Sequence, residues 1–463
     1  MKVKIVEPYY FDNRYDVRSL TPSLGPVFIA SLLKQNGHEV EVISEYVTKL
    51  NLNELDGANL VGISLTTYNA RRGFEIAQGI RGPKVFGGIH ASLMPEECLK
   101  YGDYVIKGDG HSVLQLADFL SEKGTGTIHE IPNLVYKRNG HIVHTREESK
   151  AVDVIPDFGL VKNYNKMNLN TLLRIPMLVN GSRGCLHKCT FCCIREVHKD
   201  FRKRDKTVLV KSIQSLAKTK HLLSKLFPRV ICITDDNFFS DMKWAKEVLD
   251  ELTRIRTGCE LVIQARVDVA YDEELLDLMQ RAGISRIYLG IESLSQRSLD
   301  NFEKKASLAD IEYAMKKIRM HGMDIFGLFV FGDEEFREGD GARVAAFVRR
   351  NGLSGVLIQP LTPFPGTELF RKLKAENRIL HENWNEYNGK VVFQPKNVTP
   401  RELLEEIYGC YRKVYSPVRV MKYLLSGKKG WRLGFLGEAM FRRLEGMRMH
   451  RYIRERLTAK SYE

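Results

Sequence analysis

The segment Ser182-Arg183-Gly184-Cys185-Leu186-His187-Lys188-Cys189-Thr190-Phe191-Cys192 places three cysteines at the spacing C-x3-C-x2-C, directly after an apolar run at 175–179. A short loop with this spacing brings three thiolates to one soft metal centre. A four-iron cluster held by three cysteines keeps one iron open to a small molecule. The alternative is a structural zinc site with His187 or His198 as fourth ligand. With no obvious fourth ligand, the motif favours the open cluster.

Composition limits the class of protein. The chain of 463 residues is long enough for two or three domains with substantial cores. Four of its eight cysteines cluster at 185–193 and the rest are scattered, which favours a reducing compartment with a metal site over a disulfide framework. No signal peptide or membrane-spanning stretch is visible. We therefore expect a cytoplasmic protein.

The first region alternates strand and helix patterns. Strands are predicted at 3–6, 39–43, 60–65, 85–88 and 104–106, with helices between them. This order predicts a parallel, doubly wound α/β sheet, whose ligands bind beyond the carboxyl ends of the strands. Small, hydroxyl and imidazole side chains stand at those ends, and the candidate binding residues are Gly25, Ser64, Thr66, Gly87, Gly88, His90 and Ser92, with the turn 108–111 beside them.

A second strand–helix series begins near residue 177. Six strands are predicted, at 177–179, 230–234, 261–264, 286–291, 325–331 and 356–359, fewer than the eight of a full barrel. Functional residues in such barrels lie at the carboxyl ends of the strands. The polar candidates there are Asp235, Asp236, Asn237, Gln264, Arg266, Glu292 and Ser293. An Asp after a strand is also a favoured helix N-cap, and Arg266 has an internal salt bridge to Glu292 as its alternative role.

These motifs together resemble two known families. The cysteine segment, with Phe191 before its last Cys, and the stretches 288–293, 327–332 and 361–367 resemble the radical S-adenosylmethionine (SAM) superfamily. The PxLG turn at 22–25, the strand 61–64, the GGxHxS stretch 87–92 and the Gly-x-Gly at 108–110 resemble the cobalamin-binding domain fused in front of many such enzymes. The resemblance implies a Rossmann-like cobalamin domain followed by a partial (β/α)6 barrel.

The resemblance also implies roles for single residues. Cys185, Cys189 and Cys192 would ligate a [4Fe-4S] cluster whose open iron chelates SAM. The 235–237 motif would hydrogen-bond the SAM amino group, and Arg266 suits its carboxylate. Cobalamin would lie over the strand ends of the first region. Two departures stand out: His111 replaces a usual acidic residue, and no Asp-x-His-x-x-Gly motif offers a histidine to cobalt.

We expect four segments. Residues 1–125 form the cobalamin domain, 126–172 a linker with a β-hairpin, 173–383 the barrel, and 384–463 a helical basic region. From Val418 to the end, twelve Lys and Arg stand against four Glu, so +8 of the net charge of +14 lies there. This tail is either a helical cap or a peripheral contact with an anionic membrane.

The expected function is that of a radical SAM C-methyltransferase. A 5′-deoxyadenosyl radical would activate an unactivated carbon of a small-molecule or lipid-like substrate, with electrons from a flavodoxin- or ferredoxin-like donor. The alternative is a cobalamin-dependent cyclase or rearrangement enzyme without methyl transfer. A zinc-stabilised basic nucleic-acid-binding protein is a remote alternative, because neither RNA-binding modules nor zinc-finger repeats are present. No nucleic-acid partner is expected.

Overall fold

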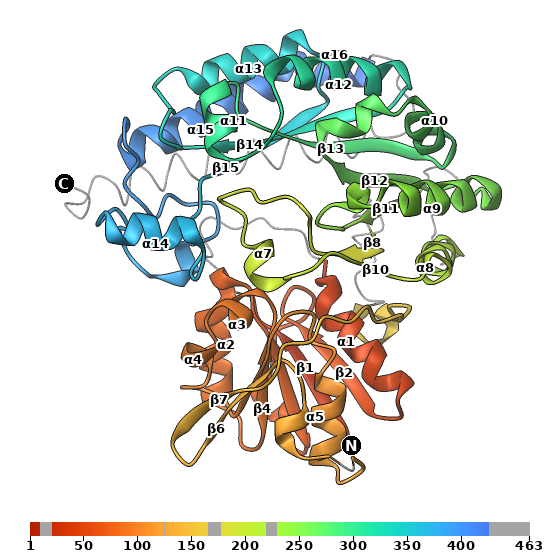
Figure 1. The fold of residues 1–463 in the computed structure, drawn as a ribbon, viewed down its shortest axis with the longest axis vertical. Coiled ribbons are helices and arrows are strands. Elements are labelled where there is room, and N and C mark those ends of the chain that lie inside the picture. Colours follow the sequence, from red (N-terminus) through yellow and green to blue (C-terminus); the bar gives the residue numbers. More distant parts are fainter. Residues whose placement is uncertain (10–20, 125, 165–176, 219–228, 426–463) are drawn as a thin grey trace.

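The computed structural model describes residues 1–9, 21–124, 126–164, 177–218 and 229–425. Two α/β units lie one above the other, with the N-terminal sheet in red and orange at one end and the second sheet in green and cyan at the other (Figure 1). The cysteine loop runs between them. Among the helices of the described ranges, none has the length and apolar character needed to cross a membrane.

The N-terminal sheet has seven strands in the order β2-β1-β3-β4-β5-β6-β7, and β1 to β5 run parallel. The predicted doubly wound sheet is confirmed. Along β1, Val3 and Ile5 pack with α1 and α5, while Val6 packs on the face covered by α2, as the period of two in a strand requires. The elements are β1 (Lys2–Glu7), α1 (Leu24–Gln35), β2 (Glu39–Ser44), β3 (Leu60–Ser64), α2 (Ala70–Gln78), β4 (Lys84–Gly87), α3 (Ile89–Leu93), α4 (Pro95–Cys98), β5 (Tyr104–Ile106) and α5 (Val113–Leu120).

The predicted hairpin is present, but it is not part of a linker. β6 (Leu134–Arg138) and β7 (His141–His144) turn at Asn139 and Gly140, both with positive φ, as a two-residue hairpin turn requires. β6 pairs antiparallel with β5 and extends the N-terminal sheet. Leu134 and Val135 are buried in its core clusters. The expected boundary at residue 125 is therefore corrected, because this apolar strand is stable only when paired.

The second unit is a six-stranded parallel sheet in the order β15-β14-β13-β12-β11-β8. Helices cover its outer face, so the predicted partial barrel is confirmed (Figure 1). Its elements are β8 (Met177–Val179), β9 (Ser182–Arg183), α7 (Ile194–Val197), β10 (Arg202–Lys203), α8 (Lys206–Lys218), β11 (Val230–Ile233), α9 (Met242–Ile255), β12 (Glu260–Ala265), α10 (Glu273–Arg281), β13 (Ile284–Glu292), α11 (Gln296–Asn301), α12 (Leu308–Met320), β14 (Asp324–Phe331), α13 (Asp340–Arg350), β15 (Gly355–Pro360) and α14 (Glu368–Ala375).

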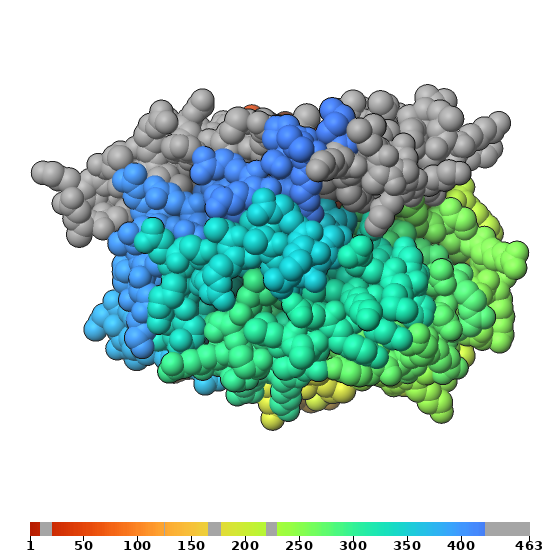
Figure 2. Space-filling view, turned by 90° about the horizontal axis from the view of Figure 1, so that it is seen from above, coloured from red at the N-terminus to blue at the C-terminus, as the bar shows by residue number. Residues whose placement is uncertain are grey.

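The C-terminal helix α15 (Pro400–Val414) completes the barrel instead of forming a separate domain. Thr399 caps it in a capping box with Glu402, as the Thr-Pro start indicates. The Tyr411 hydroxyl donates to the Ile358 carbonyl (3.0 Å) and accepts from the Ile358 N–H (2.8 Å). These bonds cover the edge strand β15. Figure 2 shows the blue C-terminal helices against the cyan surface of the barrel.

Packing contacts also cross the boundary expected at residue 384, between the barrel and the C-terminal region. Trp384, Tyr387 and Val392 are buried in the same core cluster as Phe74 and Phe86 of the N-terminal domain. The Trp384 indole N–H donates to Glu97 at 3.0 Å. This segment therefore joins the barrel to the N-terminal domain. α16 (Pro417–Leu425) follows α15, and the remainder of the basic tail, 426–463, lies outside the described residues.

The Tyr411 contact predicts a loss of stability on removal of one hydroxyl. Tyr411→Phe leaves a buried N–H and a buried carbonyl of β15 without that partner, so the free energy of unfolding should fall by about 1–3 kcal/mol. Urea unfolding followed by circular dichroism measures this. Tyr313→Phe is the matched control, because Tyr313 is 42% exposed and should change the midpoint little. Equal midpoints for both variants would contradict the role given to Tyr411.

Candidate functional site

The cysteine loop leaves the barrel at the end of β8 and is closed at its base by an antiparallel ladder. Arg183 on β9 pairs with Arg202 on β10. Gly184 follows β9 with φ +82°, and a Cβ there would lie 2.4 Å from the Asp200 carbonyl oxygen. Only glycine fits this close approach. The pairing of β9 with β10 therefore holds the two ends of the loop together.

Two aspartates at the end of β11 hold the start of the loop. The Asp235 carboxylate accepts the Gly181 N–H (2.7 Å) and the Ser182 hydroxyl (2.5 Å). Asp236 accepts the Gly184 N–H (2.9 Å). Burial raises the pKa of Asp235 to about 6, and these bonds oppose that rise. Asp235 is only 2% exposed and its two oxygens hold the loop, so the half-buried Asp236 is the better placed of the two for the predicted contact with SAM.

Asn237, the third member of the motif, is also buried. Its exposure is 5%, and it begins the short turn Phe238–Ser240. Its backbone carbonyl accepts the Ser240 N–H at 3.2 Å. Its predicted SAM contact is therefore not supported by the geometry. Within the motif, Asp235 and Asp236 hold the loop, and Asp236 also faces a cavity.

The far side of the loop rests on the segment after α11. The Thr190 hydroxyl donates to the Asn301 carbonyl at 3.2 Å, and the Phe191 and Phe302 rings pack edge to face with centroids 4.9 Å apart. An edge-to-face pair contributes about 0.5–1.5 kcal/mol beyond its buried area. The aromatic residue before the last cysteine therefore anchors the loop to the barrel.

The three motif cysteines are free thiols, each half-buried. Burial raises the pKa of Cys189 and raises that of Cys192 to about 12, so metal binding would displace protons from them. In the described part of the chain, no three His, Cys, Asp or Glu side chains are placed to hold a single ion. His198 instead lies 3.2 Å from Asp109. His198 is thereby engaged outside the cysteine loop, and three thiols on one braced loop are the donor set of an open cluster.

Cations stand beside the cysteines. The Arg266 guanidinium at the end of β12 donates to the Cys189 sulfur at 3.9 Å and to the Lys304 backbone carbonyl. Glu292, at φ +66°, accepts from the buried Lys304 ammonium at 2.6 Å. The alternative pairing of Arg266 with Glu292 is therefore wrong. Lys304 was missed from the sequence, where it appears only as one of two adjacent lysines after a short helix.

Two other predicted barrel residues have different surroundings. Gln264 is exposed, and its neighbours Ile263 and Ala265 pack in the helix-facing core, so its side chain lies on the inner face of the barrel. Ser293 is half-buried, and its hydroxyl accepts the Ser295 N–H at 3.1 Å. Gln264 is thus available to a ligand, whereas Ser293 shapes the turn after β13.

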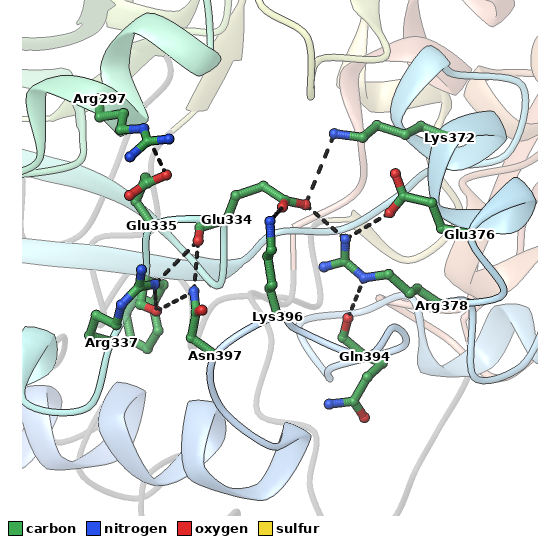
Figure 3. Close-up of polar contacts among 11 residues, drawn as sticks. Arg297, Glu334, Glu335, Arg337, Lys372, Glu376, Arg378, Gln394, Lys396 and Asn397 are labelled. Atoms are coloured by element: carbon green, nitrogen blue, oxygen red, sulfur yellow. Dashed lines mark hydrogen bonds and ion pairs between the residues drawn. The ribbon is translucent and has the colours of Figure 1, made fainter.

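The loop after β14 is held by charged side chains (Figure 3). Glu334 accepts from Arg378 (2.7 Å) and Lys396 (3.1 Å), and Glu335 pairs with Arg297 (3.1 Å). These partners come from α11 and from the segments after α14. Each partly exposed pair contributes at most about 1 kcal/mol, but together they tie the end of β14 to neighbouring loops.

A cavity lies between the two units, at the carboxyl ends of β1, β3 and β4. Its lower wall includes five of the seven predicted residues, Gly25, Ser64, Thr66, Gly87 and Gly88. A Cβ on Gly25 would have no atom within 4 Å, and one on Gly88 (φ +94°) would lie 2.5 Å from the Leu65 carbonyl. Gly25 therefore leaves open space at the cavity wall, which suits a bulky ring system such as a corrin, while Gly88 allows the close approach of the Leu65 backbone.

The other two predicted corrin residues do not line this cavity. His90 is fully buried on α3, 3.3 Å from Glu97, with its ring against Trp384. The helix turns the ring into the core, so the predicted contact of His90 with cobalamin has no support from this cavity. The Ser92 hydroxyl donates to the Gly88 carbonyl and accepts the Gly108 N–H, both at 2.9 Å. Ser92 therefore positions two glycine turns instead of touching the ligand.

The upper wall of the cavity belongs to the barrel. Arg183, Asp236, His198 and Arg202 line it. Arg202 donates to the Asp109 carboxylate at 2.6 Å, and His198 lies 3.2 Å from the same group. Asp109 comes from the turn 108–111 of the N-terminal domain. This inter-domain cluster was missed from the sequence, where the turn was the only local signal.

Comparisons with known proteins agree with this geometry. The radical SAM superfamily model matches residues 179–340, and the B12 binding domain model matches residues 14–117. The chain is a radical SAM enzyme with an N-terminal B12-binding domain. Membership implies a [4Fe-4S] cluster and SAM, and the first domain indicates cobalamin. The three loop thiols and the glycine-lined cavity are the sites that fit these groups.

Relatives of this radical SAM enzyme span most of its length. The anaerobic magnesium-protoporphyrin IX monomethyl ester cyclase of Cereibacter sphaeroides is 26% identical over 94% of this chain and 74% of its own. The bacteriochlorophyllide d C-12(1)-methyltransferase of Chlorobaculum tepidum is 24% identical over 90% of this chain and 87% of its own. The radical SAM methyltransferase TsrM of Kitasatospora setae, solved with cobalamin and a [4Fe-4S] cluster, shares the fold with a TM-score of 0.68, at 20% identity over 81% of this chain and 78% of its own.

The loop geometry predicts which cysteines hold the cluster. Cys185→Ala, Cys189→Ala and Cys192→Ala should each abolish the broad visible absorption of the reconstituted protein, because two thiolates do not replace three. Cys193→Ala is the matched control. Cys193 is half-buried, its backbone carbonyl begins α7, and it lies outside the motif spacing, so its variant should keep iron and sulfide. Loss of the cluster in Cys193→Ala with retention in Cys192→Ala would contradict this assignment.

The cavity predicts a site where one side chain blocks cobalamin. Gly25→Leu places a side chain in the open space over α1, so cobalamin retained after gel filtration should fall at least tenfold. Gly409→Leu is the matched control: it is also helical, also has no atom within 4 Å of its Cβ position, and lies on α15 away from the cavity. Equal retention by the two variants would place cobalamin elsewhere.

Proposed function

We propose that this enzyme methylates an unactivated carbon of a small-molecule or lipid-like substrate. The observation that carries the proposal is the shared wall between the two cofactor sites. Arg183 lines the cavity and stands two residues before Cys185, and Asp236 lines it while holding Gly184. A methyl donor in the cavity and a radical source on the loop would therefore face one substrate space.

Loaded with its cofactors, such an enzyme obtains a 5′-deoxyadenosyl radical from the cluster and SAM and a methyl group from cobalamin. The chain's own residues place and shield these groups. Asp236 offers a half-buried carboxylate that suits an ammonium group of SAM. On the inner face of the barrel, Gln264 and Gln359 are exposed amide side chains available to orient a substrate.

Methyl transfer is favoured over its alternative by the named relatives. A bacteriochlorophyllide methyltransferase matches the chain over 90% of its length, and the solved structure with the same fold is a methyltransferase. The alternative, a cyclisation or rearrangement with the same cofactors, is supported by the cyclase of Cereibacter sphaeroides. Both reactions need the same loop and cavity, so the product must decide between them.

Turnover with labelled SAM tests the proposal. Reconstituted enzyme is incubated anaerobically with SAM carrying a ¹³C-methyl group, a flavodoxin-type reductant, and either a metalloporphyrin methyl ester or a polycyclic lipid as substrate. We expect a product whose mass exceeds that of the substrate by one ¹³CH2 unit, because a labelled methyl group replaces a hydrogen. The Cys189→Ala variant should not form this product. An unlabelled product with a new ring would overturn methyl transfer in favour of the cyclase reading.

A further inference from the structure

Arg266 lies between the cysteine loop and the barrel, and its guanidinium is already engaged. Nη1 donates to the Cys189 sulfur at 3.9 Å, and Nη2 donates to the Lys304 carbonyl. The side chain is 11% exposed. The remaining nitrogen, Nε, has no hydrogen-bond partner among the described residues and lies 3.9 Å from Asp268 Oδ2. The guanidinium therefore links Cys189 to the segment at and after the end of α11, which also contacts Thr190 and Phe191.

The charge of Arg266 is poorly compensated. Lys304, a second cation near the loop, is 4% exposed and pairs at 2.6 Å with the buried Glu292. The acidic neighbour of Arg266 is Asp268, 3.9 Å away with a side chain 49% exposed, so water weakens that pair. The Arg266 guanidinium donates directly to the Cys189 sulfur, so its positive charge favours negative charge on this atom.

We propose that Arg266 is a positioning residue that hydrogen-bonds the Cys189 thiolate and raises the reduction potential of the cluster that this thiolate holds. Hydrogen bonds and charges near the sulfur ligands are among the factors that set cluster potentials. A cation with N–H donors stabilises the reduced, more negative cluster more than the oxidised one. The inference rests on the cluster that the family implies, and it holds whether the enzyme methylates or cyclises.

This role differs from the SAM-carboxylate contact that the sequence suggested. A carboxylate is best held by two parallel N–H groups of one guanidinium. Here the two terminal nitrogens have different partners, a sulfur and a backbone carbonyl, on the side of the residue that faces the loop. The geometry therefore assigns the guanidinium of Arg266 to the cysteine loop and not to SAM.

The test is a potentiometric titration followed by electron paramagnetic resonance, on full-length protein with its cluster reconstituted anaerobically and without SAM. Arg266→Gln removes the charge and the fork, and Arg266→Lys keeps a charge that cannot reach both partners. Arg319→Gln is the matched control. Arg319 also donates to a backbone carbonyl, that of Asn351 at 2.7 Å, but it lies at the end of α12, near the amino ends of the strands.

We expect Arg266→Gln to make reduction at least tenfold less favourable, a fall of about 59 mV for one electron. The reduction potential of Arg266→Lys should fall by less. The potential of Arg319→Gln should equal that of the wild type, with the same content of iron and sulfide. SAM binding, measured separately by equilibrium dialysis, should change less than threefold in Arg266→Gln. If Arg266→Gln holds no cluster, Arg266→Lys decides by the same criterion of a lowered potential.

An unchanged potential in the Arg266 variants that retain a full cluster would overturn the inference. If the same variants also lost SAM affinity tenfold or more, Arg266 would be assigned to the SAM carboxylate instead. Failure of the wild-type protein to take up any cluster would be a different result, since it would remove the proposed function as well.

Discussion

The buried carboxylate of Asp235 is the interaction on which the placement of the cysteine loop depends. It receives a backbone N–H and a hydroxyl at the point where the chain leaves β8. Burying a carboxylate costs several kcal/mol unless hydrogen bonds replace its water, and here two donors do so. Asp236 adds a bond to Gly184, so β9 is tied to the end of β11 at both of its ends. The three thiols that follow start from a fixed point on the sheet.

The relation between the two cofactor sites depends on contacts made on two sides of the domain interface. Asp109 meets Arg202 and His198 beside the cavity, and Glu97 meets Trp384 behind α3. Two attachments made by segments this far apart in the chain oppose a hinge motion about either one. The glycine-lined wall is thereby held facing the cysteine loop, which is the geometry that a shared substrate space requires.

Charge around the loop is arranged asymmetrically. The Lys304–Glu292 pair is buried and self-compensating, and it lies against Gly290, where a Cβ would come within 2.7 Å of both charged atoms. A buried pair of this kind is stable only if neither partner is left alone. Arg266 instead has a solvent-exposed acid at 3.9 Å and donates directly to the Cys189 sulfur. Lys304 is thus bound to its own carboxylate, while the guanidinium of Arg266 contacts the sulfur directly.

The sequence by itself determined the features that depend on local pattern. Neighbouring residues were enough to predict the C-x3-C-x2-C spacing and the alternation of apolar strands with amphipathic helices. They also predicted the bounds of β8 and α12 and five glycine or hydroxyl positions on the cavity wall. Tertiary structure decided which polar side chains at the strand ends face a ligand. Asp235, His90 and Ser92 turned out to hold the protein together, Glu292 paired with Lys304, and the hairpin joined the N-terminal sheet. Each of these outcomes depends on the direction of a side chain and on a partner elsewhere in space, and periodicity along one segment carries neither.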